Sequence, residues 1–187
     1  MAVRAIEKIM LSIREIQESD IPLLADYWFH SSDQHLIGMG VDLAKMPGRQ
    51  DFESMLRDQL QKPVESKETY CVIWLLDGQP IGHNNVNNIT FGKQANMHLH
   101  VWHPANRQSG LGHQFLCQSI PYFFKTLKLE KLYCEPYAHN PAPNNTLRKL
   151  GFEFVKTYRT IPGSINFEQE VNQWLLRADQ LNQLAGA

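Results

Sequence analysis

A glycine-containing segment at residues 107–113 constrains this chain more than any other feature. It follows an extended-looking run at residues 96–102 and a turn at His103–Asn106, and it opens a long apolar helical pattern. A strand, a turn and a glycine-containing helix start together make an anion site, because the first N–H groups of a helix lack partners and its dipole adds positive potential. Glycines let a pyrophosphate approach the backbone closely. We therefore predict that a phosphate-carrying ligand binds at Gln108–His113.

Two other phosphate-binding motifs do not fit the segment. A P-loop ends in Gly-Lys-Ser or Gly-Lys-Thr, whereas here Gly112 is followed by His113. The dinucleotide fingerprint needs a third glycine where this chain has Phe115. A helix-capping turn with incidental glycines is the simpler alternative.

Length and composition describe an ordinary globular protein. The chain has 187 residues, 43% of them hydrophobic and 20% charged, which fits one domain spanning residues 1–187 with its core at about 10–180. The net charge of −1 gives no general attraction to nucleic acid or anionic membrane. Charged residues interrupt the N-terminal apolar residues, and the cysteines are an odd number, far apart. We expect a cytoplasmic monomer or homodimer with no nucleic-acid or membrane partner.

Hydrophobic periodicity predicts a mixed α/β (α+β) fold, with one sheet and helices on its faces. Residues 31–49 lack periodicity and are predicted to be a long loop that has room for a helical turn. Asp51 is predicted to cap the helix that follows, and Pro121 to kink or split a later one. The predicted strands are residues 11–16, 70–76, 79–89, 94–102, 131–135, 152–161 and 169–177, with buried aromatic side chains at Phe115, Phe152 and Trp174.

Four segments in order resemble the GNAT acetyltransferases, and among them the ribosomal-protein N-acetyltransferase-like (RimJ/RimL-type) branch. The resemblance covers about residues 10–180. The matching segments are Leu11–Arg14 with Asp20, Arg107-x-x-Gly110-x-Gly112, Asn140-Pro141-Ala142 followed by Leu147–Phe152, and Val171–Arg177.

The resemblance implies a three-layer sandwich around a central mixed, mostly antiparallel, splayed sheet of six to seven strands. It implies acetyl-CoA as co-substrate, without a metal, and a primary amine as acceptor, either a protein N-terminus or a small molecule. The amine would attack the thioester directly in a ternary complex. Asn140 has the alternative role of a simple cap. The implied coenzyme-binding residues are His100, Val101, Trp102, Arg107, Gln108, Ser109, Gly110, Leu111, Gly112, His113 and Asn140.

The proton-handling positions of the family are altered in this chain. Asn96 and Met97 occupy the strand positions where relatives carry a carboxylate base. Pro143 stands where the branch commonly has serine, and Leu147 where other branches have a tyrosine general acid. A catalytically inactive sensor or interaction module that binds acetyl-CoA is therefore the alternative to an enzyme.

Two histidines are the candidates for catalysis. The period of a strand puts His98 and His100 on one face, and an imidazole accepts a proton at neutral pH. We predict that His98 is the general base and that His100 replaces it only if a bulge lies beyond His100. Strand packing is the alternative role for both, and a zinc site lacks an evident third ligand. In the loop at 31–49, Asp33, His35 and Asp42 are candidates for attracting a cationic amine, unless the loop is simply solvated.

Overall fold

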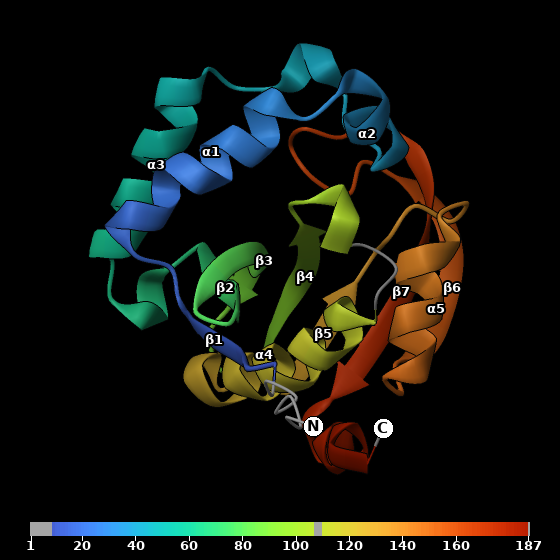
Figure 1. Ribbon diagram of the computed structural model, residues 1–187. Helices are drawn as coiled ribbons and strands as arrows, with labels where there is room; N and C mark the ends of the chain where they lie inside the picture. The colour runs from blue at the N-terminus through green and yellow to red at the C-terminus, as the bar shows by residue number, and fades with distance from the viewer. Residues whose placement is uncertain (1–8, 107–109, 187) are drawn as a thin grey trace, which may run out of the picture.

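Seven strands form one mixed sheet in the order β1-β2-β3-β4-β5-β7-β6, within the described residues 9–106 and 110–186 of this computed structural model (Figure 1). Neighbouring strands are antiparallel except for the parallel pair β4 and β5. The predicted mixed, mostly antiparallel sheet is confirmed. The strands are β1 (Leu11–Glu15), β2 (Thr69–Leu76), β3 (Gln79–Thr90), β4 (Gln94–Val101), β5 (Lys131–Cys134), β6 (Glu153–Thr160) and β7 (Gln169–Arg177).

Helices flank the sheet on both faces (Figure 1). The α-helices are α1 (Ile21–His30), α2 (Asp33–Gly38), α3 (Arg49–Gln61), α4 (Leu111–Leu127) and α5 (Pro141–Lys149). The short 3₁₀ helices are η1 (Glu18–Asp20), η2 (Leu43–Lys45), η3 (Val64–Ser66), η4 (Pro104–Asn106) and η5 (Ala178–Gly186).

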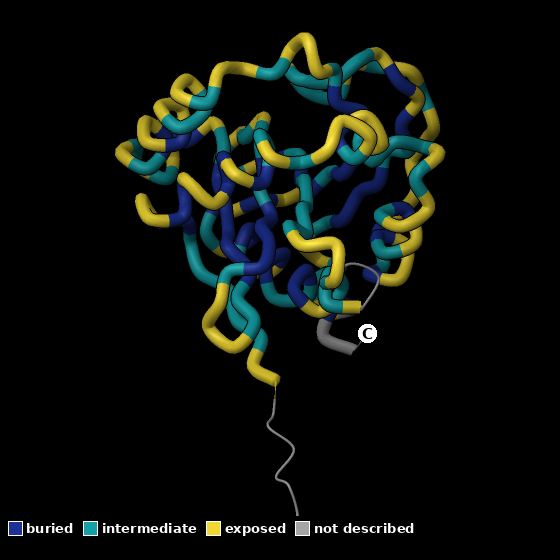
Figure 2. Tube along the Cα trace, turned by 45° about the horizontal axis from the view of Figure 1, so that its top comes forward, coloured by how far each residue is buried: buried dark blue, intermediate teal, exposed yellow. Residues whose placement is uncertain are grey.

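Each face of the sheet buries its own apolar cluster. Alternate residues of β2 point to opposite faces, so Trp74 packs with α4 while Ile73 packs with α1 and α3. The Trp74 indole lies parallel to the Phe115 ring with their centroids 5.1 Å apart. The predicted burial of Phe115, Phe152 and Trp174 is confirmed. Figure 2 shows the buried segments gathered in the middle of the molecule and the exposed ones at its periphery.

The structure differs from the local predictions in three places. The segment at residues 31–49 contains α2 and η2, whose few residues are too short to show a helical period. Helix α3 begins after Gly48, so Asp51 lies inside its first turn and does not cap it. Helix α4 neither ends nor splits at Pro121. The proline faces solvent, while Ile120 and Phe123 beside it are fully buried and hold the helix against the sheet.

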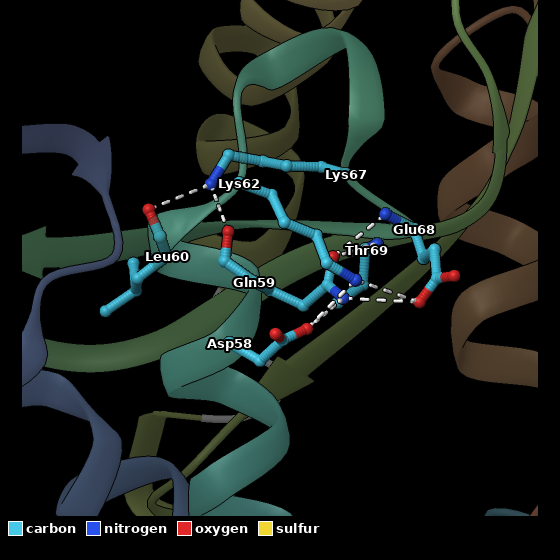
Figure 3. A network of polar contacts seen from close by, with 7 residues as sticks. All are labelled: Asp58, Gln59, Leu60, Lys62, Lys67, Glu68 and Thr69. Atoms are coloured by element: carbon cyan, nitrogen blue, oxygen red, sulfur yellow. Dashed lines mark hydrogen bonds and ion pairs between the residues drawn. The ribbon is translucent and has the colours of Figure 1, made fainter.

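The C-terminal end of α3 is fastened to the start of β2 by two buried polar side chains (Figure 3). The Lys67 ammonium donates hydrogen bonds to the carbonyl oxygens of Gln59 and Leu60, which are among the unpaired acceptors of the last helical turn. The Gln59 side-chain oxygen accepts from the main-chain N–H groups of Glu68 and Thr69, at 2.8 and 3.3 Å. Helix α3 is thereby held in place beside α1.

The central strands separate at one end. Strand β4 pairs with β5 from Gln94 to Met97, opposite Lys131 to Cys134, and runs on to Val101 beyond the end of that ladder. The opening between them is called the splay below. The main-chain N–H of Trp102 donates to Ile81 on the β3 side. Main-chain direction alternates along an antiparallel strand, so the groups of Leu99 and Val101 point into the splay.

Candidate active site

A cavity of about 760 Å³ occupies the splay and extends to both of its ends. Its walls in the middle are the last residues of β4 and the residues that follow β5. One end reaches the starts of α4 and α5, and the other reaches α1, α2 and the loop between β6 and β7. The splay therefore joins the predicted phosphate site to the predicted acceptor loop.

The start of α4 offers bare backbone to the cavity. Gly110 has a φ of 79°, in the left-handed region that glycine adopts freely, and Gly112 follows in the first turn. A Cβ added at Gly112 would meet no atom within 4 Å. Gly110, Gly112 and His113 all line the cavity. The helix N-terminus thus leaves open space beside its backbone, which is what an approaching pyrophosphate requires.

The other predicted coenzyme residues divide into three groups. Arg107, Gln108 and Ser109 lie outside the described residues. His100 and Val101 line the cavity, whereas the side chains of Leu111 and Trp102 pack against the apolar clusters. The sequence placed Trp102 among the residues that face the splay. Its main-chain N–H instead donates to Ile81 of β3, on the other side of the strand. Leu99, which the sequence did not single out, takes that place.

Asn140 caps α5 and also lines the cavity. Its side-chain oxygen accepts from the main-chain N–H of Ala142 at 3.3 Å. The hydrogen bond is that of a helix cap, as the alternative role predicted, and the position in the cavity lining also leaves Asn140 within reach of a ligand. Asn144, one turn later, is buried and bonds to four partners. Its side chain donates to the carbonyls of Tyr137 and Asn140 and accepts from Asn172 and Trp174.

His98 is a half-buried imidazole whose neutral form is favoured. It lies on the face opposite Met97, together with His100, as the strand period predicted. Burial lowers the pKa of His98, and the carboxylate of Glu135 opposes this effect. His98 Nε2 lies 3.2 Å from the side-chain oxygen of Asn87. Because an amide oxygen only accepts, Nε2 carries the proton and Nδ1 keeps its lone pair. The ring is therefore equipped to accept a proton at Nδ1.

His100 belongs to an aromatic cluster at the acceptor end. Its Nδ1 lies 3.2 Å from the Tyr27 hydroxyl, which is also 3.3 Å from His35 Nε2. The His83 ring stacks on His100 with a centroid distance of 4.7 Å. Burial lowers the pKa of His83 to about 3, and its Nδ1 accepts from Trp102 Nε1 at 2.7 Å. His83 is therefore neutral, and His100 is a packed ring that also reaches the cavity.

Glu135 is a cavity residue that sequence reasoning missed. Its Oε1 accepts from the Tyr158 hydroxyl at 2.7 Å and from Gln173 Nε2 at 2.6 Å. It follows Cys134, the last paired residue of β5, as His98 follows Met97 on β4. Met97 and Cys134 point into the apolar core, so His98 and Glu135 point to the other face. The sequence carries one weak signal, an acid directly after an apolar strand.

Main-chain contacts close the acceptor end. The Gly40 carbonyl accepts from the side chains of Asn166 and Gln169, at 2.8 and 3.2 Å. Gly40 has a φ of 86°, and a Cβ there would lie 2.2 Å from Gln169 Oε1, so glycine suits both the backbone conformation and the close approach. Of the acceptor candidates, His35 lines the cavity, while Asp33 and Asp42 do not.

Neither a metal site nor a membrane span is evident in the part of the chain that the structure describes. No three histidine, cysteine or acidic side chains there gather closely enough to hold a metal ion. No helix there combines the length and the apolar character needed to cross a membrane.

Several solved acetyltransferases share this architecture. Spermidine N-acetyltransferase from Vibrio cholerae, in complex with CoA and spermine, aligns with a TM-score of 0.75 at 14% identity, over 92% of this chain and 98% of that one. RimL, a ribosomal L7/L12 α-N-protein acetyltransferase in complex with coenzyme A, gives 0.74 at 13% identity, over 90% and 94%. RimJ of Mycobacterium smegmatis, in complex with CoA-disulfide, gives 0.74 at 13%, over 94% and 88%. At such identities the likeness is one of fold.

Sequence comparison identifies the family. No curated protein matches the chain. A family profile described as an acetyltransferase (GNAT) domain matches residues 10–153, which include β1 to β5, the glycines of α4 and the whole of α5. The chain belongs to the GNAT acetyltransferase domain family.

Proposed function

We propose that this protein is an N-acetyltransferase that transfers the acetyl group of acetyl-CoA to a primary amine. One observation carries the proposal: a single cavity connects the bare backbone at Gly112 with the half-buried imidazole of His98 through the splay. The pyrophosphate would lie on the start of α4, and the pantetheine arm would run along the splay. Main-chain groups of Leu99 and Val101 would pair with that arm and with the thioester carbonyl.

The chemistry is a direct transfer in a ternary complex. The amine nitrogen attacks the thioester carbonyl carbon, a C–N bond forms, and the C–S bond breaks. An ammonium substrate and acetyl-CoA give the acetamide, free CoA thiol and one released proton. His98 Nδ1 would take the proton from the attacking nitrogen, since burial keeps the ring neutral. Main-chain N–H groups in the splay would stabilise the developing oxyanion.

The acceptor is proposed only as a primary amine, either a protein N-terminus or a small molecule. The similar structures include enzymes named for spermidine and for a ribosomal protein. The four matching sequence segments favour the RimJ/RimL-type branch, whose conserved spacing between Asn140 and Gly151 this chain reproduces.

The test combines binding and turnover. Acetyl-CoA should raise the melting temperature, and a thiol-release assay with acetyl-CoA should detect turnover on at least one member of a panel of amines. The panel should include an aromatic monoamine, a polyamine, an aminoglycoside and peptides with free N-termini. If acetyl-CoA leaves the melting temperature unchanged, the proposed donor site is wrong.

The second candidate is a coenzyme-binding module without catalysis. It is favoured by the burial of Met97 and Leu147, which are 1% and 0% exposed and sit where relatives carry proton-handling groups. Tight binding of acetyl-CoA without turnover on any amine would support this module and contradict the enzyme.

A further inference from the structure

The cavity contains one carboxylate among its described residues, and hydrogen bonds from the sheet fix its position. Among the described residues that line the cavity, Glu135 alone carries an acidic side chain. Two hydrogen bonds, from Tyr158 on β6 and Gln173 on β7, fix its Oε1. No described residue donates a hydrogen bond to Oε2. One oxygen is therefore held by the sheet, and the other remains to accept from a ligand.

The register of the sheet brings this carboxylate beside His98. Met97 and Cys134 are the last paired residues of β4 and β5, and paired strands lie about 4.8 Å apart. Glu135 and His98 follow directly, on the same face and on opposite sides of the splay. The carboxylate also acts on the pKa of His98, in the direction that favours the charged ring. An amine bound to Glu135 would therefore lie next to the proposed base.

The rest of the acceptor end has no acidic side chain among the described residues. Its lining comes from Tyr27, His35, Met39, His100 and Pro162, with the amide side chains of Asn166 and Gln169. These groups suit an aromatic or aliphatic body and provide no second carboxylate for a cation. A second ammonium buried there would lose its hydration without gaining a carboxylate, which is strongly unfavourable.

We propose that Glu135 binds the ammonium group of the acceptor and that the cavity selects primary amines with one positive charge and an apolar or aromatic body. This inference rests on the proposed amine acetylation and narrows its substrate class. It excludes polyamines as preferred acceptors. A single small-molecule ammonium and a peptide N-terminus both satisfy the charge requirement.

The test is titration calorimetry on the full chain saturated with CoA, with 2-phenylethylamine and spermidine as probes. The aromatic monoamine should bind at least about tenfold more tightly than spermidine. Glu135→Gln keeps the size of the side chain and an oxygen for Tyr158 and Gln173 but removes the charge. It should weaken 2-phenylethylamine by about 10- to 100-fold, since hydrogen bonds to charged groups are the stronger class. Its affinity for CoA should be unchanged.

Glu168→Gln is the matched control, because Glu168 is an exposed acid outside the cavity lining. It should leave the affinity for 2-phenylethylamine at the parental value. If Glu135→Gln does not fold, Tyr158→Phe serves in its place, because it removes one of the two hydrogen bonds that position Oε1. It should weaken the binding of 2-phenylethylamine several-fold.

Each outcome decides between the two proposals. Tighter binding of spermidine, an unaffected Glu135→Gln variant, or failure of both amines to bind the CoA-saturated protein overturns this inference and leaves coenzyme binding intact. Failure of CoA itself to bind overturns the proposed function and this inference together.

Discussion

Valine at position 112 should abolish coenzyme binding without unfolding the protein. Gly112 lies in the first turn of α4 with a backbone conformation that other residues adopt, and a Cβ there meets no protein atom within 4 Å. The valine side chain would therefore project into the cavity and not into the core. Helix propensity differs between glycine and valine by only about 0.5 kcal/mol, so the free energy of unfolding of the apo-protein should stay near the parental value.

The size of the lost signal follows from ligand linkage. A ligand that binds only the native state, at a hundredfold excess over its Kd, adds about 2.7 kcal/mol to the free energy of unfolding. For a chain of this length each kcal/mol shifts the melting temperature by about 2–4 °C, so acetyl-CoA should raise the parental melting temperature by about 5–11 °C. Gly112→Val should show almost none of this shift.

Differential scanning fluorimetry with and without acetyl-CoA measures both quantities. Gly38→Val is the control, since a Cβ at Gly38 also meets open space and this residue lies outside the cavity lining. The control should keep the full shift. A folded Gly112→Val protein that acetyl-CoA still stabilises by the parental amount would refute the assignment of the phosphate site.

Three further substitutions test the base, the core and the fastening of α3. His98→Gln should lower kcat by about 10²–10⁴-fold at neutral pH and remove the acidic limb of the pH profile. That limb should lie below pH 6.5, because burial lowers the pKa of His98. His103→Gln should do neither, and a loss under about fivefold for His98→Gln would contradict the role of His98 as the base. Phe115→Ala removes a fully buried ring and should lower the free energy of unfolding by about 3–5 kcal/mol in urea denaturation; a parental midpoint would show that the ring is not in the core. Lys67→Met should lower it by about 1.5–3 kcal/mol, whereas Lys62→Met, at an exposed ion pair, should change it little, and equal effects would contradict the buried contact.

Local patterns were sufficient for most of the fold. The Asp77-Gly78 pair between β2 and β3 is typical of a two-residue hairpin turn, and both residues have the positive φ, 49° and 79°, that such a turn needs. Apolar residues located the strands, as an unbroken run in β2, which is buried on both faces, and in alternation at the start of β4. Helix α2 was not predicted, because its six residues and the single cap at Ser32 give too little periodic signal. The predicted split at Pro121 does not occur, because tertiary packing outweighs the loss of one helical hydrogen bond.

Some residues of the candidate site can be predicted from local sequence, and others only from long-range contacts. The neighbours in the sequence are sufficient to identify Gly110, Gly112 and His98. Asn144 does not, because an asparagine in a helix ordinarily faces solvent, and its partners Asn172 and Trp174 arrive from β7. Only the sheet order, in which β7 lies beside β5, brings them to α5.

Glu135 depends on the register of β5 in the same way. Leu132 and Cys134 are buried in the core, and this burial fixes which residues of β5 face the cavity. A slip of one residue would exchange the two faces, placing the Glu135 carboxylate among apolar side chains and a thiol beside His98. Burying an unpaired carboxylate there is strongly unfavourable, so the core enforces the register that the site requires. Packing on the opposite face of the sheet thus decides that the cavity contains a carboxylate, although β4 has none at Asn96 and Met97.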